Sequence, residues 1–247
     1  MNTEPTPAPP PLPPQGNPAP AVHRWEFSPM EGSATFGNII DHLLKRPGRL
    51  MHAFASGGTG RVSTALVLSS VACLAIFGLL LGTFSGGVQL WAAPLKVTAG
   101  MLVAVLICLP SLYIFSALAG VSGRLSYIMN VLFAAIALSG LLLLGFAPVL
   151  WVFAQSTDIA AFIGFLALMF WLVSLGFGLR MLLAAATMHG AQSVDYIKVW
   201  MTIFVVVTLQ MSTALRPIIG TANTFLPVEK RFFLQHWLEQ LQESSRK

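Results

Sequence analysis

Five long runs of mainly apolar residues divide this chain, and they limit its fold more than any other feature. The runs cover 63–84, 98–120, 128–154, 160–187 and 197–215. A helix needs about 20 mainly apolar residues to cross the hydrocarbon core of a bilayer. No Asp, Glu or Lys lies in the middle of a run, and the alternating pattern of a membrane β-barrel is absent. The sequence therefore predicts an all-α membrane protein: a bundle of about five transmembrane helices with amphipathic flanking helices.

The composition supports this class. Charged residues make up only 9% of the 247 residues and hydrophobic residues 55%, whereas soluble domains carry roughly a quarter charged residues. The net charge of +5 is spread over the two ends and the short loops. This distribution is typical of a protein oriented in a bilayer, and it argues against a nucleic-acid-binding surface.

The segments outside the runs predict three flanking regions. Residues 1–33 are rich in Pro and predict a disordered tail, with docking of its Pro-rich stretch into an aromatic groove as the alternative. The tail has no apolar signal-peptide core, so the first span should act as its own signal. Residues 34–55 and 227–243 have apolar and polar faces at helical spacing, which predicts amphipathic helices on the bilayer surface. The helix at 227–243 could instead dock to a partner. The bundle itself covers 63–216.

Lys and Arg predict the orientation of the bundle. Five of the 14 Lys and Arg residues precede the first run, Arg124 lies in the second loop, and Arg180 and Lys198 flank the fourth. Cytoplasmic loops carry an excess of Lys and Arg, so the amino terminus should be cytoplasmic. Five spans then place the basic carboxyl-terminal tail outside, unless one run is re-entrant.

The last run ends on polar residues. Arg216 can extend its side chain to the interface, and Pro217 fits the exit because proline cannot continue a helix without losing a hydrogen bond. Gln210 lies deeper and is predicted to be a polar clamp between helices, with a substrate contact as the alternative.

Three glycines follow each other at a spacing of four along the first run. Gly78, Gly82 and Gly86 would let two helices approach closely. The partner could be another helix of this chain, which we favour, or another protein.

Two segments predict membrane anchors. In the loop 84–96, Trp91 and Lys96 suit the interface, although this loop could also hold a small re-entrant turn. Beyond the bundle, Phe233 and Trp237 lie on the apolar stripe of the carboxyl-terminal helix and should anchor it.

The motifs of catalysis are missing. There is no HExxH, no GxSxG and no pair of carboxylates within a run. We therefore predict no catalytic residues, no metal site and no cofactor. His189 and Asp195 would be the candidates if the chain were a membrane enzyme. Pro110 and Pro148 can each kink a helix, and transporters use broken helices at their binding sites.

The order of a Pro-rich tail, the amphipathic segment with "LLKRPGRL" and five close spans resembles the Yip1-like families. Residues 85–120, with "SGGVQLWAAPLKV" and "LICLPSLYIFSALAG", and 198–220, with "KVWMTIFVVVTLQMSTALRPIIG", are similar to a group of bacterial integral membrane proteins of unassigned function. The resemblance implies a membrane protein without an established reaction, and for Yip1-like proteins a link to membrane organisation and partner binding.

These observations lead to one expected function and one main alternative. We expect a non-enzymatic, multi-pass protein of the bacterial inner membrane that acts as a subunit or scaffold of a membrane complex. Its partners would be membrane lipids and other membrane subunits or a second copy, and not nucleic acid. The alternative is a permease or a lipid-handling transport component.

Overall fold

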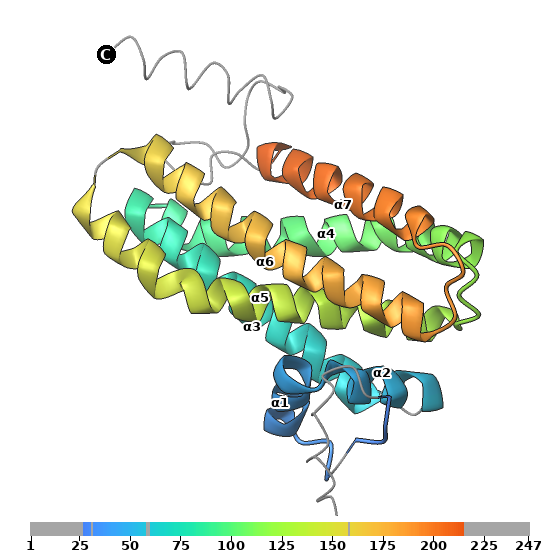
Figure 1. Ribbon diagram of the computed structural model, residues 1–247. Coiled ribbons are helices and arrows are strands. Elements are labelled where there is room, and N and C mark those ends of the chain that lie inside the picture. The colour runs from blue at the N-terminus through green and yellow to red at the C-terminus, as the bar shows by residue number, and fades with distance from the viewer. Residues whose placement is uncertain (1–26, 31, 58–59, 158, 215–247) are drawn as a thin grey trace, which may run out of the picture.

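The computed structural model describes residues 27–30, 32–57, 60–157 and 159–214, and all seven of the elements in these ranges are helices. They are α1 (Phe36–Lys45), α2 (Pro47–Ser56), α3 (Gly60–Ser85), α4 (Gln89–Leu118), α5 (Leu125–Ser156), α6 (Ala160–Met188) and α7 (Asp195–Ala214). Figure 1 shows the five long helices running back and forth, with α1 and α2 on one side of the bundle.

Four helices, α3 to α6, are long and apolar enough to cross a membrane. The all-helical bundle is thus confirmed, and these four contain or overlap the first four predicted spans. The fifth predicted span, 197–215, coincides with α7 up to Ala214. Because α7 is not among the four, the fifth span stays a prediction. The predicted helix at 227–243 and most of the predicted tail lie outside the described residues.

Glycine explains the sharpest turn between two long helices. Gly86 and Gly87 have φ angles of +66° and +55°, which side chains other than glycine rarely tolerate. The chain reverses there within three residues, and α4 begins at Gln89. We had expected a longer loop, with the helix starting at 98. That prediction was wrong, because Pro94 fits inside the helix and the residues before it are mostly good helix formers.

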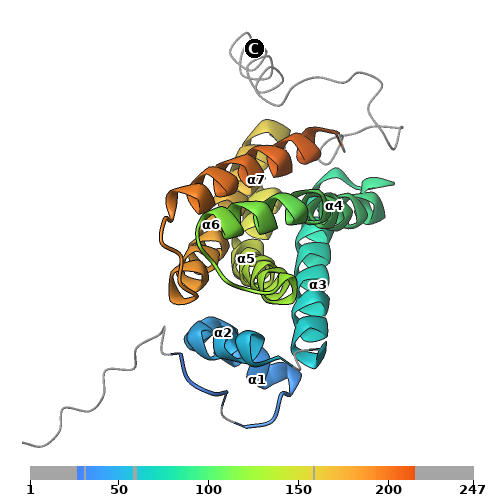
Figure 2. The same ribbon diagram turned by 90° about the vertical axis from the view of Figure 1, so that its right-hand side faces the viewer.

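The helices pack as a ring that is nearly closed. Helix α3 packs against α4 and α5, α5 packs against α6, and α4 packs against α7. Helices α6 and α7 touch only weakly. Figure 2 shows α5 in the centre with α3 along the right-hand side, α7 lying across the top, and α1 and α2 at the bottom. The core is formed mainly by the facing sides of α3, α5 and the inner parts of α4, α6 and α7.

Candidate functional site

Small residues bring α3 and α4 into backbone contact. A methyl group added to Gly78 would lie 2.6 Å from the Cα of Pro94, and one added to Gly82 would lie 2.6 Å from the carbonyl oxygen of Gln89. The glycine stripe therefore packs within the chain. Gly86, which the sequence pattern groups with these two glycines, does not belong to this contact. Helix α3 ends at Ser85, and Gly86 takes part in the turn that follows.

Two further glycines make close contacts that the sequence analysis did not identify. A methyl group on Gly178 of α6 would lie 2.2 Å from Ser139 Oγ and 2.4 Å from the Ala135 carbonyl oxygen of α5. On Gly140 of α5 it would lie 3.1 Å from Cys73 Cβ of α3. Each of these glycines has small residues opposite it on the facing helix, a cross-chain pattern that a single run does not reveal.

The polar clamp between α7 and its neighbour is made by Trp200. Its indole Nε1 donates to the carbonyl oxygen of Cys108 at 3.2 Å and to Ser111 Oγ at 3.0 Å. The expected clamp, Gln210, lies on the same side of α7 as the exposed Ile203. Among the described residues its buried Oε1 has no hydrogen-bond partner, so this oxygen makes no clamp. A clamp through the side-chain amide nitrogen of Gln210 stays a prediction.

The α4–α5 and α6–α7 loops meet at one end of the bundle. The Gln192 amide donates to the Ala119 carbonyl at 2.8 Å and thereby ties the two loops together. His189 stacks on the ring of Tyr127 with centroids 4.0 Å apart, and the Tyr127 hydroxyl donates to the Ala185 carbonyl at 3.2 Å. His189 thus has a packing role here.

Asp195, the other residue considered for an enzyme, accepts a hydrogen bond from Lys198 Nζ at 2.9 Å. It lies at the start of α7, where a negative charge interacts favourably with the helix dipole. These contacts give Asp195 a local structural role. Within the described part of the chain, no three His, Cys, Asp or Glu side chains are arranged to hold a metal ion.

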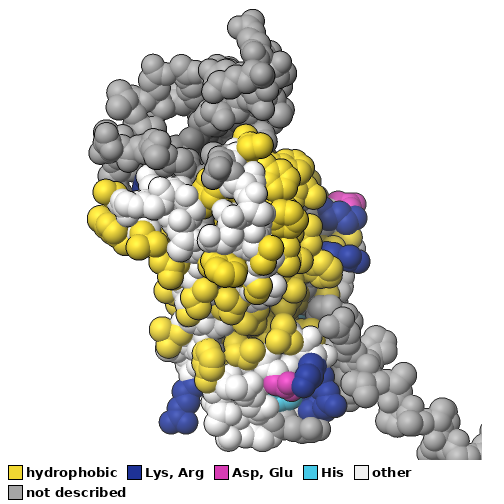
Figure 3. Space-filling model, turned by 90° about the vertical axis from the view of Figure 1, so that its left-hand side faces the viewer, with side chains coloured by type: hydrophobic (Ala, Val, Ile, Leu, Met, Phe, Trp, Pro, Cys, Tyr) yellow, Lys and Arg dark blue, Asp and Glu magenta, His cyan; other side chains and the backbone are white. Residues whose placement is uncertain are grey.

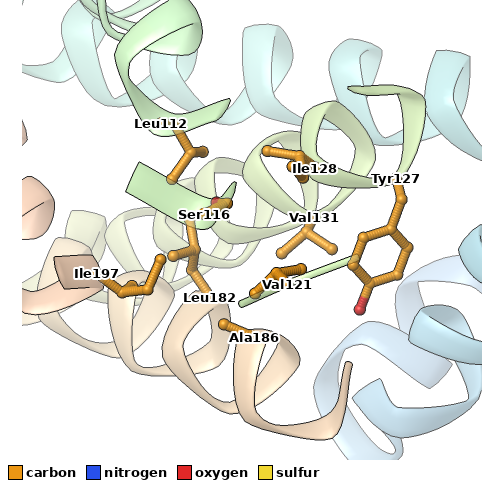
Figure 4. Close-up of a pocket in the computed structure, with 9 residues that line it drawn as sticks. All are labelled: Leu112, Ser116, Val121, Tyr127, Ile128, Val131, Leu182, Ala186 and Ile197. Atoms are coloured by element: carbon orange, nitrogen blue, oxygen red, sulfur yellow. The ribbon is translucent and has the colours of Figure 1, made fainter. Parts of the chain in front are cut away.

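A small apolar cavity lies inside this loop junction. Its volume is about 20 Å³, close to what one water molecule requires. Ser116 and Tyr127 are the only residues in its lining with polar side chains. Figure 4 shows the lining residues, which are Leu112, Ser116, Val121, Tyr127, Ile128, Val131, Leu182, Ala186 and Ile197. The cavity is too small for a solute or a lipid chain, so it is a packing defect between the helices.

The apolar faces of α1 and α2 are turned toward the bundle. Ile39, Leu43, Leu50 and Met51 are each at most 1% exposed, and the two helices contact α3, α5 and α6. The predicted helical segment 34–55 therefore folds against the protein with its apolar side. Residues at the end of the predicted tail also pack, because the Phe27 ring lies 4.9 Å from that of His52.

The outer surface of α1 carries charge. Lys45 Nζ lies 2.5 Å from an oxygen of Asp41, one helical turn away. This hydrogen bond, together with the positive charge of Lys45, holds the pKa of the Asp41 carboxyl below its usual value. Figure 3 shows basic side chains near α1 and along one edge of the molecule, with a broad hydrophobic surface between them.

The predicted anchors differ in their placement. Trp91 is 62% exposed on the first turn of α4, as an interfacial tryptophan would be. Lys96 is 2% exposed, so the expectation that its side chain extends into the interface from a loop is wrong. Its position on the second turn of a helix, and not in a loop, explains the difference. Arg216, Pro217, Phe233 and Trp237 lie outside the described residues.

Neither proline interrupts its helix. Helix α4 continues through Pro110, and α5 continues through Pro148. Each proline removes one backbone hydrogen bond but leaves the helix intact, which is common in membrane helices. The discontinuous helices that would mark a transport site are not found among the described residues.

Comparison with known proteins does not assign the chain to a family. No family model matches it, and no curated protein or solved structure shows a significant match. The fold and the contacts above define a class, a multi-helix protein with four helices able to cross a membrane.

Proposed function

We propose that this chain is a multi-pass protein of the bacterial inner membrane that acts as a non-enzymatic subunit or scaffold of a membrane complex. One observation carries the proposal. The most apolar windows of α4 and α6 are each only 33% buried, against 56% for α3 and α5. The outer helices therefore leave wide apolar faces for lipid or for another transmembrane subunit.

The internal packing supports a scaffold over a transporter. The closest helix contacts, at Gly78, Gly82 and Gly178, join helices of the same chain and leave no room between them. The cavity in the loop junction is small and apolar. A rigid, internally closed bundle with free outer faces suits a protein that holds partners in place.

The orientation is part of the proposal. Exposed Arg61, Arg124 and Lys198 lie at or just before the first turns of α3, α5 and α7. The loop junction lies where α5 and α7 begin, and α3 begins at the same end of the bundle because it runs parallel to α5. An excess of Lys and Arg is typical of the cytoplasmic side, so we place this end and the amino terminus in the cytoplasm. Membership of a Yip1-like group remains a proposal that rests on the order of the segments.

The test is purification of the tagged full chain from its native membrane in mild detergent, with identification of co-purifying proteins. A stoichiometric partner is the expected result. Leu106→Trp on α4 and Phe177→Ala on α6 alter the two exposed faces, where these side chains are 69% and 53% exposed. Loss of the partner in one variant locates its binding face.

Leu68→Trp, at a 59% exposed position on α3, is the matched control. A chain that purifies as a monomer and crosslinks to nothing in native membranes would overturn the proposal. Flux of lipid or solute in reconstituted vesicles would favour the transport alternative.

A further inference from the structure

Arg180 is an exposed cation on the side of a long apolar helix. It lies on α6, about two turns before the helix ends at Met188. Preceding residues on its side of the helix, Val173 and Phe177, are large, apolar and 40% and 53% exposed. In the described part of the chain, no carboxylate forms an ion pair with Arg180. Arg180 thus lies at the end of the exposed apolar stripe that contains Val173 and Phe177.

Helix contacts place Arg180 at the same depth as residues of two other helices. Its neighbour Gly178 faces Ala135 of the antiparallel helix α5. Helix α5 runs parallel to α3, because Ser63 bonds to Asn130 and Cys73 faces Gly140, a constant offset along both helices. This register puts Arg180, Ala135 and Leu68 at about one level.

The surface of α3 changes character at that same level. Arg61 and Thr64 are exposed toward its beginning, whereas Leu68, 59% exposed, is its first large exposed apolar residue. Two helices that are far apart in sequence therefore change from polar to apolar surface at one depth. A common cause acting on both helices from outside, the edge of the hydrocarbon layer, accounts for this agreement.

The length of α6 agrees with that boundary. From Ala160 to Arg180 the helix rises about 30 Å, which is the thickness of the hydrocarbon core. The remaining turns of α6 carry Leu182 and Ala185, which are buried at 3% and 0% exposure. Helix α2 packs beside α5 and α6, and Figure 1 shows α2 near this end of α6.

We propose that the guanidinium of Arg180 binds the phosphate of a membrane phospholipid and fixes the depth of α6 in the bilayer. Guanidinium groups bind phosphate through paired hydrogen bonds, and a long side chain can reach the headgroups from an apolar helix. The last turns of α6 and the first turns of α5, with α1 and α2, then lie beyond the hydrocarbon. This inference rests on the membrane placement proposed above.

The boundary is oblique to the bundle. On α4, Ile114 and Leu118 are both 58% exposed near the helix end. The apolar surface thus extends further along α4 than along α3 and α6. Helices α1 and α2 contact α3, α5 and α6, and Figure 2 shows them at the bottom of the bundle, away from α4. They therefore lie on the side where α3 and α6 carry the shorter apolar surface.

Two probes test the boundary because they flank Arg180 symmetrically. Val173→Cys and Thr187→Cys each lie two turns from Arg180 on the same side of α6, and both native residues are exposed. The full chain, spin-labelled at either cysteine, is placed in vesicles of phosphatidylcholine and phosphatidylglycerol. Cys73 and Cys108 are buried, and the unsubstituted chain measures their background labelling.

We expect the label at 173 to collide mainly with oxygen, which concentrates in lipid. The label at 187 should collide mainly with a water-soluble nickel chelate. The ratio of oxygen collisions to nickel collisions should therefore differ several-fold between the two labelled positions. If both labels are exposed to lipid, the hydrocarbon layer does not end at Arg180, although α6 still lies in the membrane. If both labels are exposed to water in folded protein, the boundary at Arg180 and the membrane placement of α6 are both wrong.

A third measurement tests the phosphate contact itself. In Arg180→Gln, this end of α6 should move deeper into the hydrocarbon layer, so the accessibility of the 187 label to nickel should fall. Arg180→Lys retains the positive charge and should leave that accessibility unchanged. Lys198→Gln removes a cation already paired with Asp195 and is the control. An unchanged accessibility in Arg180→Gln, in a chain that elutes as the native protein does, would show that Arg180 does not set the depth.

Discussion

The indole nitrogen of Trp200 donates a hydrogen bond to the backbone carbonyl of Cys108, joining α7 to the middle of α4 at 3.2 Å. Trp200 is 0% exposed and stacks on Phe204, with ring centroids 5.1 Å apart. Helix α7 makes few contacts with α6, which precedes it in the chain. The position of α7 therefore depends mainly on this one side of α4.

Replacing Trp200 with Phe should loosen α7. The substitution removes the hydrogen bonds to Cys108 and Ser111 and part of a buried ring, and we expect a loss of about 1–2 kcal/mol in the free energy of unfolding. The buried thiols of Cys73 and Cys108 report unfolding through a thiol-reactive dye during heating in detergent. Trp91→Phe, at a 62% exposed position, is the control and should leave the transition unchanged. Equal shifts in the two variants would contradict the role given to Trp200.

Gly78→Ala should destabilise the contact between α3 and α4. The added methyl would lie 2.6 Å from a backbone atom of Pro94, and overpacking of this kind costs about 1–3 kcal/mol. Gly145→Ala is the matched control, because a methyl there meets nothing within 4 Å and alanine favours a helix. The midpoint of thermal unfolding should fall for the first variant and stay or rise for the second. An unchanged unfolding midpoint in Gly78→Ala would show that α3 and α4 can move apart without a loss of stability.

Gly178→Ala should be more damaging, and a second substitution should not rescue it. The new methyl would overlap both Ser139 Oγ and the Ala135 carbonyl oxygen. Ser139→Ala removes the first obstacle but leaves the second, since the carbonyl belongs to the backbone. We expect the double variant to stay about 1–3 kcal/mol less stable than Ser139→Ala alone. Full recovery in the double variant would mean that only the serine side chain limits the approach of α6.

Tyr127 allows its two contacts to be separated. Tyr127→Phe keeps the ring stacked on His189 and loses only the hydrogen bond to Ala185, so we expect a cost of about 0.5–1.5 kcal/mol. Tyr127→Leu loses the stacking as well and should cost more. Unfolding in a graded denaturant mixture measures both values. The assignment fails if the leucine variant is as stable as the phenylalanine variant.

Local pattern predicted the long helices well because each run had one requirement, enough apolar residues to fill a helix. It failed where a helix end depended on a single turn, as at Gln89, and where a residue's role depended on the opposite helix. Gln210 was chosen as a clamp for its chemistry, whereas Trp200, a residue with one donor inside an apolar run, makes the bond. Gly140 and Gly178 were missed because close approach requires small residues on two helices at once.

The sequence by itself determined the class of this protein. With so few charged side chains, long apolar runs can bury their surface only against each other or against lipid, and helices satisfy their backbone groups within the run. Only the tertiary structure decided which faces pack and which remain free. That choice depends on where small residues on separate helices meet, as Gly178 meets Ala135, and the pairing of such sites is a property of three-dimensional register.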